Sequence, residues 1–326
     1  MLSMSSNPEF STNISSVGSI GTFPRPDQRV VTIVDHAPLT PRDLSVPLRA
    51  TTAMMRTTGA TRVQLKFPGT QELANHPTIA PFVEGVLDAS NGVQRGVIFT
   101  AHNRGDRNRP PESWDEVREI WQRPLTVSPV ERIQQVIGAG NTFTTVFNDA
   151  DIPRMAEIWQ AFGWDETGVK EWLNDYRSGI GGWACGVRGS DGQIQALAKA
   201  ELLELDGMGL VESTEWAAGD RQKGLGTAAA IALNANILNN PPSTHGWTIY
   251  AEANMAEKIP GHRVARNAGF HACADFNTIV PNGVLRQHVT VERKLRDFLL
   301  VQLTPDAIQT CYPPDVLRYI NSQFTL

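Results

Sequence analysis

The sequence predicts an α/β protein with mixed sheets, in which a smaller N-terminal α/β domain precedes a larger C-terminal domain. Three observations support this class. Between residues 28 and 102, short strand patterns alternate with helical or irregular segments. A second alternation of strands and helices begins at Thr142. Within it, a glycine-bearing turn leads from a strand directly into an alanine-rich helix.

The N-terminal domain is expected to have the order β-α-β-α-β. Its three strands are expected at Arg29–Val34, Arg62–Phe67 and Gln94–His102. A helix with Thr40 as N-cap is expected to run to about Thr58, and a segment interrupted by prolines covers Gln71–Leu87.

The larger domain contains two helices and a hairpin before the glycine turn, and a strand and a short helix after it. The expected elements are strand Thr142–Phe147, helices Ile152–Phe162 and Asp165–Tyr176, hairpin Gly182–Arg188 with Gln193–Glu204, strand Leu210–Trp216, strand Gly246–Asn254 and helix Ile259–Ala268. Asn282-Gly283 then favours a second hairpin, with strands at His271–Val280 and Val284–Arg293.

The expected divisions of the chain follow from these patterns. Residues 1–25 are rich in Ser, Asn, Gly and Thr and lack a basic start and an apolar middle, so we expect a disordered leader and no signal peptide. Residues 26–138 form the N-terminal domain and a linker helix, and residues 139–296 form the larger domain. Residues 297–326 are a tail that covers the sheet or a second subunit, which leaves a homodimer open.

Composition excludes several function classes. The net charge of −5 argues against a broad nucleic-acid surface. No apolar run approaches the roughly 18 residues of a membrane span, so no membrane partner is expected. Cys185, Cys273 and Cys311 are odd in number and far apart, which favours reduced thiols in the cytoplasm. Since the Cys and His residues have no metal-ligand spacing, no metal is expected.

The glycine turn is the clearest candidate binding site. Arg221, Gly224 and Gly226 stand in the pattern R-x-x-G-x-G, and Thr227 follows at the start of the helix. Glycines allow successive backbone N–H groups to converge, and the helix dipole adds positive potential at this end. A diphosphate would suit such a site. The alternative is a glycine turn that only starts a helix.

The residues R-Q-K-G-L-G-T-A and the alanine-rich helix after them resemble the acetyl-CoA pyrophosphate loop of the GNAT superfamily of N-acetyltransferases. In that family a splayed strand precedes the loop, a second strand follows the helix, and a shorter helix ends in a Gly-Phe pair. This chain has each part in order, the pair being Gly269-Phe270. The resemblance covers roughly residues 140–296. It implies a GNAT-like acetyltransferase domain that uses acetyl-CoA or another acyl-CoA.

The resemblance also implies which groups bind the acyl-CoA. Backbone groups of the strand would bind the pantetheine arm, amides of the turn would bind the diphosphate, and an asparagine often lies near the pantetheine. In this chain these positions are Trp216, Ala217 and Ala218 on the strand, Gln222, Lys223, Gly224, Leu225, Gly226 and Thr227 in the turn with Arg221 adding charge, and Asn254.

A carboxylate on the strand before the loop is the usual base in this family, and two are present here. Glu212 and Glu215 are three residues apart, so regular pleating predicts that they face opposite sides of the sheet. We expect Glu215 to be the catalytic base because it lies nearer the splay, and Glu212 is the second candidate. Solvated or ion-paired strand glutamates remain the alternative for either residue.

The family often has a tyrosine as general acid for the departing thiolate, four residues before the Phe of the Gly-Phe pair. Ala265 occupies that position here, which puts a dedicated acid in doubt, and His262 is the alternative. Two helices border the acceptor site in this fold. Their aromatic residues would line that site or belong to the core, and they are Trp159, Phe162, Trp164 and Trp172.

A more distant similarity is to the β-lysine N-acetyltransferase branch, carried by Thr248-Ile249, Pro260-Gly261, Asn277-Thr278-Ile279 and the strand Val63–Pro68. It suggests a small-molecule partner with a free amine, an amino acid or a polyamine, acetylated by direct attack in a ternary complex. Two other functions stay open. One is a catalytically weak acyl-CoA sensor or partner-binding module, and the other is a protein or peptide N-acetyltransferase.

Overall fold

The fold is described from a computed structural model of the 326-residue chain. The described residues are 12–14, 18–25, 30–35, 62–77, 80, 83–87, 96–103, 114–125, 127–180, 182–205, 208–219, 224–244, 246–254, 259–273, 298–322 and 324–325. The helix expected from Thr40 to about Thr58 lies outside them.

The N-terminal unit contains a six-stranded sheet with the order β1-β2-β3-β4-β6-β5. Its elements are β1 (Thr12–Ile14), β2 (Gly18–Arg25), β3 (Val30–Asp35), β4 (Arg62–Gly69), the short helix α2 (Gln71–Ala74), β5 (Val83–Leu87) and β6 (Gly96–Asn103). β3 and β4 are parallel, and the other neighbours are antiparallel. The three expected strands are present.

The structure differs from the expected leader at β1 and β2, because Ile20–Arg25 of β2 pairs with the apolar strand β3. Composition alone suggested disorder over residues 1–25, yet a strand forms its ladder with backbone N–H and C=O groups, which polar residues also have.

The larger unit is built on an eight-stranded mixed sheet with the order β12-β13-β11-β10-β9-β8-β7-β14. Its strands are β7 (Thr142–Thr144), β8 (Trp183–Arg188), β9 (Ile194–Leu205), β10 (Met208–Ala218), β11 (Gly246–Asn254), β12 (His271–Ala272), β13 (Phe298–Leu303) and β14 (Phe324–Thr325). The α/β fold with a mixed sheet is therefore confirmed.

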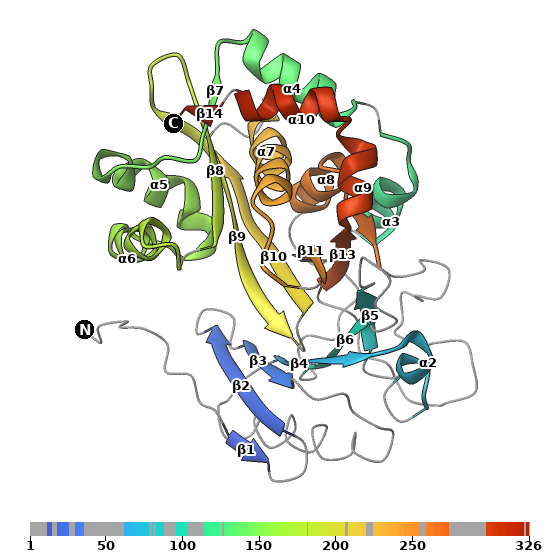
Figure 1. The fold of residues 1–326 in the computed structure, drawn as a ribbon. Coiled ribbons are helices and arrows are strands. Elements are labelled where there is room, and N and C mark those ends of the chain that lie inside the picture. Colours follow the sequence, from blue (N-terminus) through green and yellow to red (C-terminus); the bar gives the residue numbers. More distant parts are fainter. Residues whose placement is uncertain are drawn as a thin grey trace.

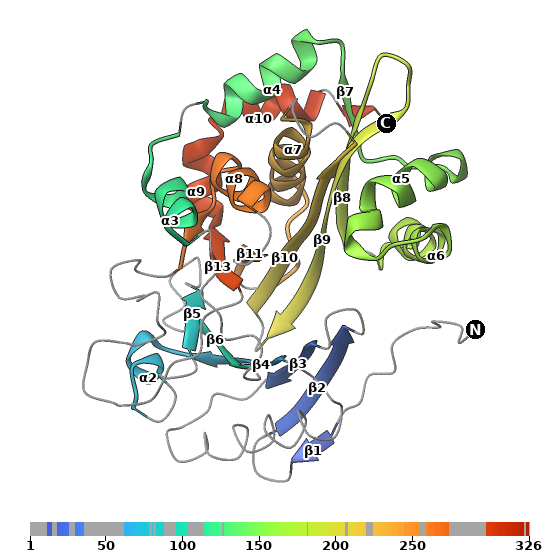
Figure 2. The same ribbon diagram turned by 180° about the vertical axis from the view of Figure 1, so that it is seen from behind.

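Helices cover both faces of this sheet. They are α3 (Trp114–Gln122), α4 (Pro129–Gly138), α5 (Ile152–Trp159), α6 (Glu166–Arg177), α7 (Leu225–Asn239), α8 (Ile259–Asn267), α9 (Pro305–Cys311) and α10 (Pro314–Ser322), with single 3-10 turns at Asp149–Asp151 and Gln160–Phe162. α5 and α6 lie on one face, named here the α5 face, while α7 and its neighbours lie on the other, the α7 face (Figures 1 and 2).

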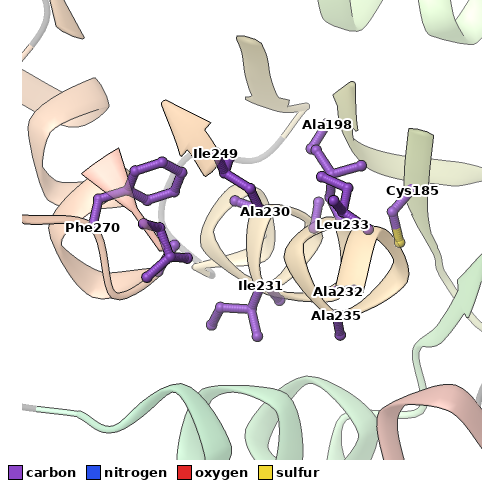
Figure 3. Close-up of a cluster of buried hydrophobic side chains, with 14 of the residues drawn as sticks. Cys185, Ala198, Ala230, Ile231, Ala232, Leu233, Ala235, Ile249 and Phe270 are labelled. Atoms are coloured by element: carbon purple, nitrogen blue, oxygen red, sulfur yellow. The ribbon is translucent and has the colours of Figure 1, made fainter. Parts of the chain in front are cut away.

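Helix α7 is the centre of the larger core. Its sequence, LGTAAAIALNANILN, is apolar nearly all round, which is typical of a helix buried on every side. Its alanines allow close approach to Ala198 and Cys185 on the sheet, while Ile231 points away from the strands (Figure 3). Helices α4 and α10 cover the far side of α7, so the helix lies between the sheet and an outer layer (Figure 1).

Two expected divisions differ from the packing. Val117 and Trp121 of α3 and Ile133 and Val136 of α4 belong to the α7 core, so the expected linker before residue 139 packs with the larger unit. The expected tail from residue 297 is also part of this unit, since β13 pairs with β11 and β14 pairs with β7.

The expected hairpin after residue 270 is described only in part. β12 ends at Ala272, and residues 274–297 lie outside the described part of the chain. On the edge of β11 away from β10, the paired strand is β13, because Phe298–Leu303 is apolar enough to lie inside the sheet.

Candidate active site

The two central strands of the larger sheet separate at a defined point. β10 and β11 pair in parallel from Met208 and Gly246 to Glu212 and Tyr250. Beyond that pair β10 stays paired with β9, while β11 stays paired with β13 as far as Asn254. The facing edges of β10 and β11 are therefore not paired with each other after Glu212, and this separation is the splay that the family resemblance implied.

A β-bulge interrupts β10 within the splay. The register of β10 against β9 shifts between Thr214 and Ala217. Glu215 lies in the bulge with φ of +56°, a left-handed conformation that costs a non-glycine residue roughly 1–2 kcal/mol. The indole Nε1 of Trp159 donates a 2.9 Å hydrogen bond to the Glu215 carbonyl and so supports this backbone.

The bulge changes the side of the sheet that Glu215 faces. Thr214 is paired with Lys199, and Glu215 lies beside the same lysine on the α5 face. Trp216 then turns to the α7 face, where it contacts Phe270 with ring centroids 5.4 Å apart. Because Glu212 also lies on the α5 face, the prediction that the two glutamates face opposite sides is wrong. The extra residue in the bulge removes the alternation on which that prediction rested.

Glu215 lies in a largely buried, charged environment. Its Oε2 is 3.4 Å from Nζ of Lys199, longer than the 2.7–2.9 Å typical of a charged hydrogen bond. Among the described residues this oxygen accepts no hydrogen bond of ordinary geometry. Burial raises the pKa of Glu215 above its usual value, and the opposing effects of Lys199 and of the Trp164 indole are smaller. This carboxylate can therefore accept a proton at a pH closer to neutrality than an exposed glutamate.

Glu212 is held differently, at the last pair before the splay. Its Oε2 accepts a 2.9 Å hydrogen bond from the Tyr250 hydroxyl. Lys66, which β4 of the N-terminal unit contributes, donates to the same hydroxyl over 3.0 Å and lies 3.9 Å from Glu212 Oε2. Leu87 and Val97 of the N-terminal sheet pack beside Tyr250. Glu212 and Tyr250 thus link the start of the splay to Lys66 of the N-terminal unit.

The glycine turn opens helix α7 as expected. Gly224 is the N-cap with φ of +67°, and it has no side chain with which to cap the helix. The first N–H groups of a helix have no intrahelical acceptor, so those at Leu225, Gly226 and Thr227 are available to an anion. Arg221, Gln222 and Lys223 lie outside the described residues.

A basic side chain that the sequence did not indicate lies against this turn. A Cβ atom on Gly224 would come within 2.7 Å of Nη1 of Arg132, so the guanidinium lies directly on the glycine. Helix α4 fixes Arg132 there, since Ser128 and Glu131 form a capping box at its start. A cation beside the positive end of a helix favours an anionic ligand, and the turn therefore fits the diphosphate of an acyl-CoA.

The structure describes the expected acyl-CoA contacts on β10 in full and the one at Asn254 in part. Ala217 and Ala218 pair with Leu197 and Ala196 of β9, and their other edge faces the splay. Trp216 directs its indole Nε1 to Ser213 Oγ over 2.8 Å. The backbone of Asn254 pairs with Phe298, and its side chain lies outside the described part.

The four aromatic candidates of the acceptor site cluster beside Glu215. Trp159 is fully buried and Trp172 nearly so, and their ring centroids are 5.2 Å apart. Phe162 and Trp164 are half-buried at the border of the same cluster. Trp159 and Trp172 therefore belong to the core, while Trp164 also covers the ammonium of Lys199 at 4.6 Å from its ring centroid.

The position of the missing tyrosine and the alternative acid, His262, are both buried. Ala265 is fully buried. His262 is also fully buried, and its Nδ1 accepts a 3.1 Å hydrogen bond from Trp121, which joins α8 to α3. His262 therefore has a structural role, and its proposed role as general acid is not supported. Tyr312 is buried beside α8 and donates to the carbonyl of Ala268.

Sequence reasoning missed Lys66, Lys199 and Arg132. The first two carried a signal, because each is a lysine inside an otherwise apolar strand, V-Q-L-K-F and A-L-A-K-A. A charged residue at such a position must be paired when it is buried. The sequence has no such signal for Arg132, because the position of this side chain depends on the packing of α4 against α7.

The described residues contain neither a helix suited to span a membrane nor a cluster of metal ligands. None of their helices is long and apolar enough to cross a membrane. No group of three or more His, Cys, Asp or Glu side chains in that part of the chain could hold a metal ion.

No family model matches the chain, and no curated protein matches it. Solved structures similar to it include ribosomal-protein-alanine N-acetyltransferase from Brucella melitensis (17% identity, 50% of this chain, 98% of that chain, TM-score 0.34). A GNAT superfamily phosphinothricin acetyltransferase from Sinorhizobium meliloti, solved with acetyl-CoA, has 16% identity over 50% of this chain and 88% of its own, with a TM-score of 0.34. A putative acetyltransferase from Salmonella typhimurium, also solved with acetyl-CoA, has 17% identity. The match covers 51% of this chain and 94% of that chain, with a TM-score of 0.34.

Proposed function

We propose that the protein is an acyl-CoA-dependent N-acetyltransferase of the GNAT type that acetylates a small amine. The observation that carries the proposal is the path of β10. The strand leaves β11 after Glu212, bulges at Glu215, and is followed by the turn at Gly224 that opens α7. One strand thereby joins an unpaired backbone edge, a carboxylate and an uncapped helix N-terminus.

The chain's own groups suit acetyl-CoA at each of its parts. Acetyl-CoA would supply an activated acetyl thioester. The first N–H groups of α7, with Arg132 beside Gly224, would hold its diphosphate. The unpaired edge of β10 at Ala217 and Ala218 would hydrogen-bond the extended pantetheine arm as a neighbouring strand would. These contacts would hold the thioester beside the bulge.

Glu215 is the proposed base. An acceptor ammonium must lose a proton before its nitrogen can attack the thioester carbonyl, and Oε2 of Glu215 has capacity to accept that proton. The raised pKa of Glu215 makes it a more effective base near neutral pH than an ordinary glutamate. A thiolate is a weakly basic leaving group, so a missing tyrosine at position 265 does not prevent its departure.

The acceptor proposed is an amino acid or a polyamine, in keeping with the distant similarity to β-lysine N-acetyltransferases. Glu201, Glu212 and Glu215 lie beside two lysines, Lys66 and Lys199, so the carboxylates outnumber these cations and an acceptor ammonium matches the remaining negative charge. Cys185, Cys273 and Cys311 form no disulfide within the described part of the chain, in keeping with the proposal of a cytoplasmic protein.

A second candidate function is an acyl-CoA sensor with little turnover. Ala265 favours it, since this buried residue occupies the position where the family often has its acid. A sensor would bind acetyl-CoA and release no thiol.

The test is free-thiol release from acetyl-CoA with lysine, β-lysine, ornithine, polyamines and aminoglycosides, together with thermal shift. Thiol release with one or a few amines supports the enzyme and identifies its acceptor class. No release across the panel, with acetyl-CoA still raising the melting temperature, favours the sensor or a macromolecular acceptor. No release and no thermal shift would reject acyl-CoA as ligand.

A further inference from the structure

Lys199 is a buried lysine in the middle of the candidate active site. It lies on β9 opposite Thr214, at the point where the bulge of β10 begins. Its side chain is 4% exposed, although lysine is rarely buried unless it is paired. It lies on the α5 face beside Glu215, where the mechanism proposed above gives it no role.

The ammonium of Lys199 has three neighbours among the described residues. Its closest partner is Oε1 of Glu201, at 2.5 Å on the same strand. The ring of Trp164 lies 4.6 Å from Nζ, within the range of a cation–π interaction. Oε2 of Glu215 is the third neighbour, at 3.4 Å. Glu201 and Trp164 therefore hold the ammonium through contacts that do not involve Glu215.

The two carboxylates differ in exposure. The side chain of Glu201 is 58% exposed, and that of Glu215 is 18% exposed. Water therefore screens the charge of Glu201 more than that of Glu215, and the lysine charge acts most strongly on the more buried partner. The strained backbone at Glu215, supported by Trp159, brings its carboxylate to this lysine.

We propose that Lys199 is a positioning residue for Glu215: anchored by Glu201 and Trp164, its ammonium holds the Glu215 carboxylate on the α5 face and keeps it unprotonated until an acceptor amine binds. This inference rests on the function proposed above, in which Glu215 is the base. In the reaction the proton of the acceptor ammonium passes to Oε2 of Glu215 and then to water. Lys199 stays protonated throughout and transfers no proton.

The charged and titratable groups around Glu215 agree with this role. Lys199 and Glu201 come from β9, and Glu212 precedes it on β10. Trp159 and Trp164 are the neutral neighbours from the α5 side. Although burial lowers the pKa of Lys199, the two carboxylates raise it to a net value above that of a free lysine, so its charge persists at neutral pH.

The test uses variants that change the charge near Glu215 in opposite directions. Lys199→Met removes the cation and retains an unbranched apolar side chain. In this variant the acid limb of the pH profile of kcat/KM should move to higher pH by about one to three units, because Glu215 loses a close opposite charge. Glu201→Gln removes an anion that raises the pKa of Glu215, so its limb should move to lower pH. Lys199→Arg keeps the charge and should move the limb less than Lys199→Met does.

A second readout separates this inference from the proposed enzyme. Carboxyl ¹³C NMR titration of Glu215 follows its protonation without any turnover. Shifts of opposite sign in Lys199→Met and Glu201→Gln support the role of Lys199 even if no variant releases thiol, a result that would reject the proposed function alone. An unchanged Glu215 titration in folded Lys199→Met protein overturns the inference. If Lys199→Met does not fold, Lys199→Gln removes the same cation with a polar side chain, and an unchanged Glu215 titration in that variant overturns the inference.

Discussion

The hydroxyl of Tyr250 donates a 2.9 Å hydrogen bond to Oε2 of Glu212, and these two residues form the last register pair before β10 and β11 separate. The same hydroxyl accepts from Lys66, which stands 184 positions earlier in the chain. Three polar side chains thus meet where the N-terminal sheet reaches the splay. Tyr250 is fully buried and Lys66 nearly so, and therefore their hydrogen bonds matter more than surface ones would.

Tyr250→Phe should lower the free energy of unfolding by about 1–3 kcal/mol, because the buried Lys66 ammonium loses an acceptor and Glu212 loses a donor. Urea unfolding measures this difference. Tyr319→Phe is the matched control, since Tyr319 is 39% exposed and its change should be within about 0.5 kcal/mol. Equal stability of the two variants would mean that the three-residue contact contributes nothing.

Glu215→Gln should reduce kcat by about 10²–10⁴-fold near neutral pH, the usual contribution of a general base. Acetyl-CoA affinity should be unchanged, because the carboxylate does not contact the diphosphate site. The measurements are thiol release and acetyl-CoA titration. Glu212→Gln is the comparison variant and should lose much less activity. A large loss in Glu212→Gln alone would transfer the role of base to Glu212.

Gly224→Glu should abolish acetyl-CoA binding, because it places a carboxylate at the N-terminus of α7 and beside Arg132. Thermal shift with acetyl-CoA measures binding directly. Gly192→Glu is the control for strain: Gly192 also has a positive φ (+77°), and nothing lies near the position of its Cβ. Both variants should lose roughly 1–2 kcal/mol of stability, and only Gly224→Glu should lose the shift. An intact shift in Gly224→Glu would reject the diphosphate site.

The ion pair of Asp151 with Arg188 should make stability depend on acid pH. Both guanidinium Nη atoms contact Asp151 at 2.8 Å. Burial alone raises the pKa of Asp151, but hydrogen bonds from Arg188 and the Asn148 backbone N–H bring the net pKa below its usual value. A lowered folded-state pKa stabilises the protein above the unfolded pKa, and that stability is lost as pH falls through the folded pKa.

Urea unfolding at pH 6 and pH 3 tests this effect with Asp151→Asn. The variant should be less stable than wild type at pH 6, and the difference should become smaller at pH 3. A difference that stays constant between the two pH values would show that the pair does not titrate as proposed.

Much of the fold around the site could be predicted because its signals are local. The glycines at 224 and 226, the alanine run of α7 and the alternation of Gly246–Asn254 each specify one element within a few residues. The turn from β10 to α7 was predicted for the same reason.

The errors share a physical cause, which is dependence on contacts between distant residues. No Gly or Pro indicates the bulge at Glu215, and only the register with β9 and the bond from Trp159 reveal it. Lys66 reaches the splay from another sheet, so no local pattern places it there. The pairing of β13 with β11 likewise depends on residues about 50 positions apart.

The C-terminal strands have a consequence for synthesis of the protein. β13 lies between β11 and β12 near one edge of the larger sheet, and β14 forms the opposite edge beside β7. Both are translated after every other strand of that sheet. During synthesis, one backbone edge of β11 and one of β7 therefore stay unpaired until residues 298–325 leave the ribosome. A chain released before that point would expose these two strand edges, which favours aggregation.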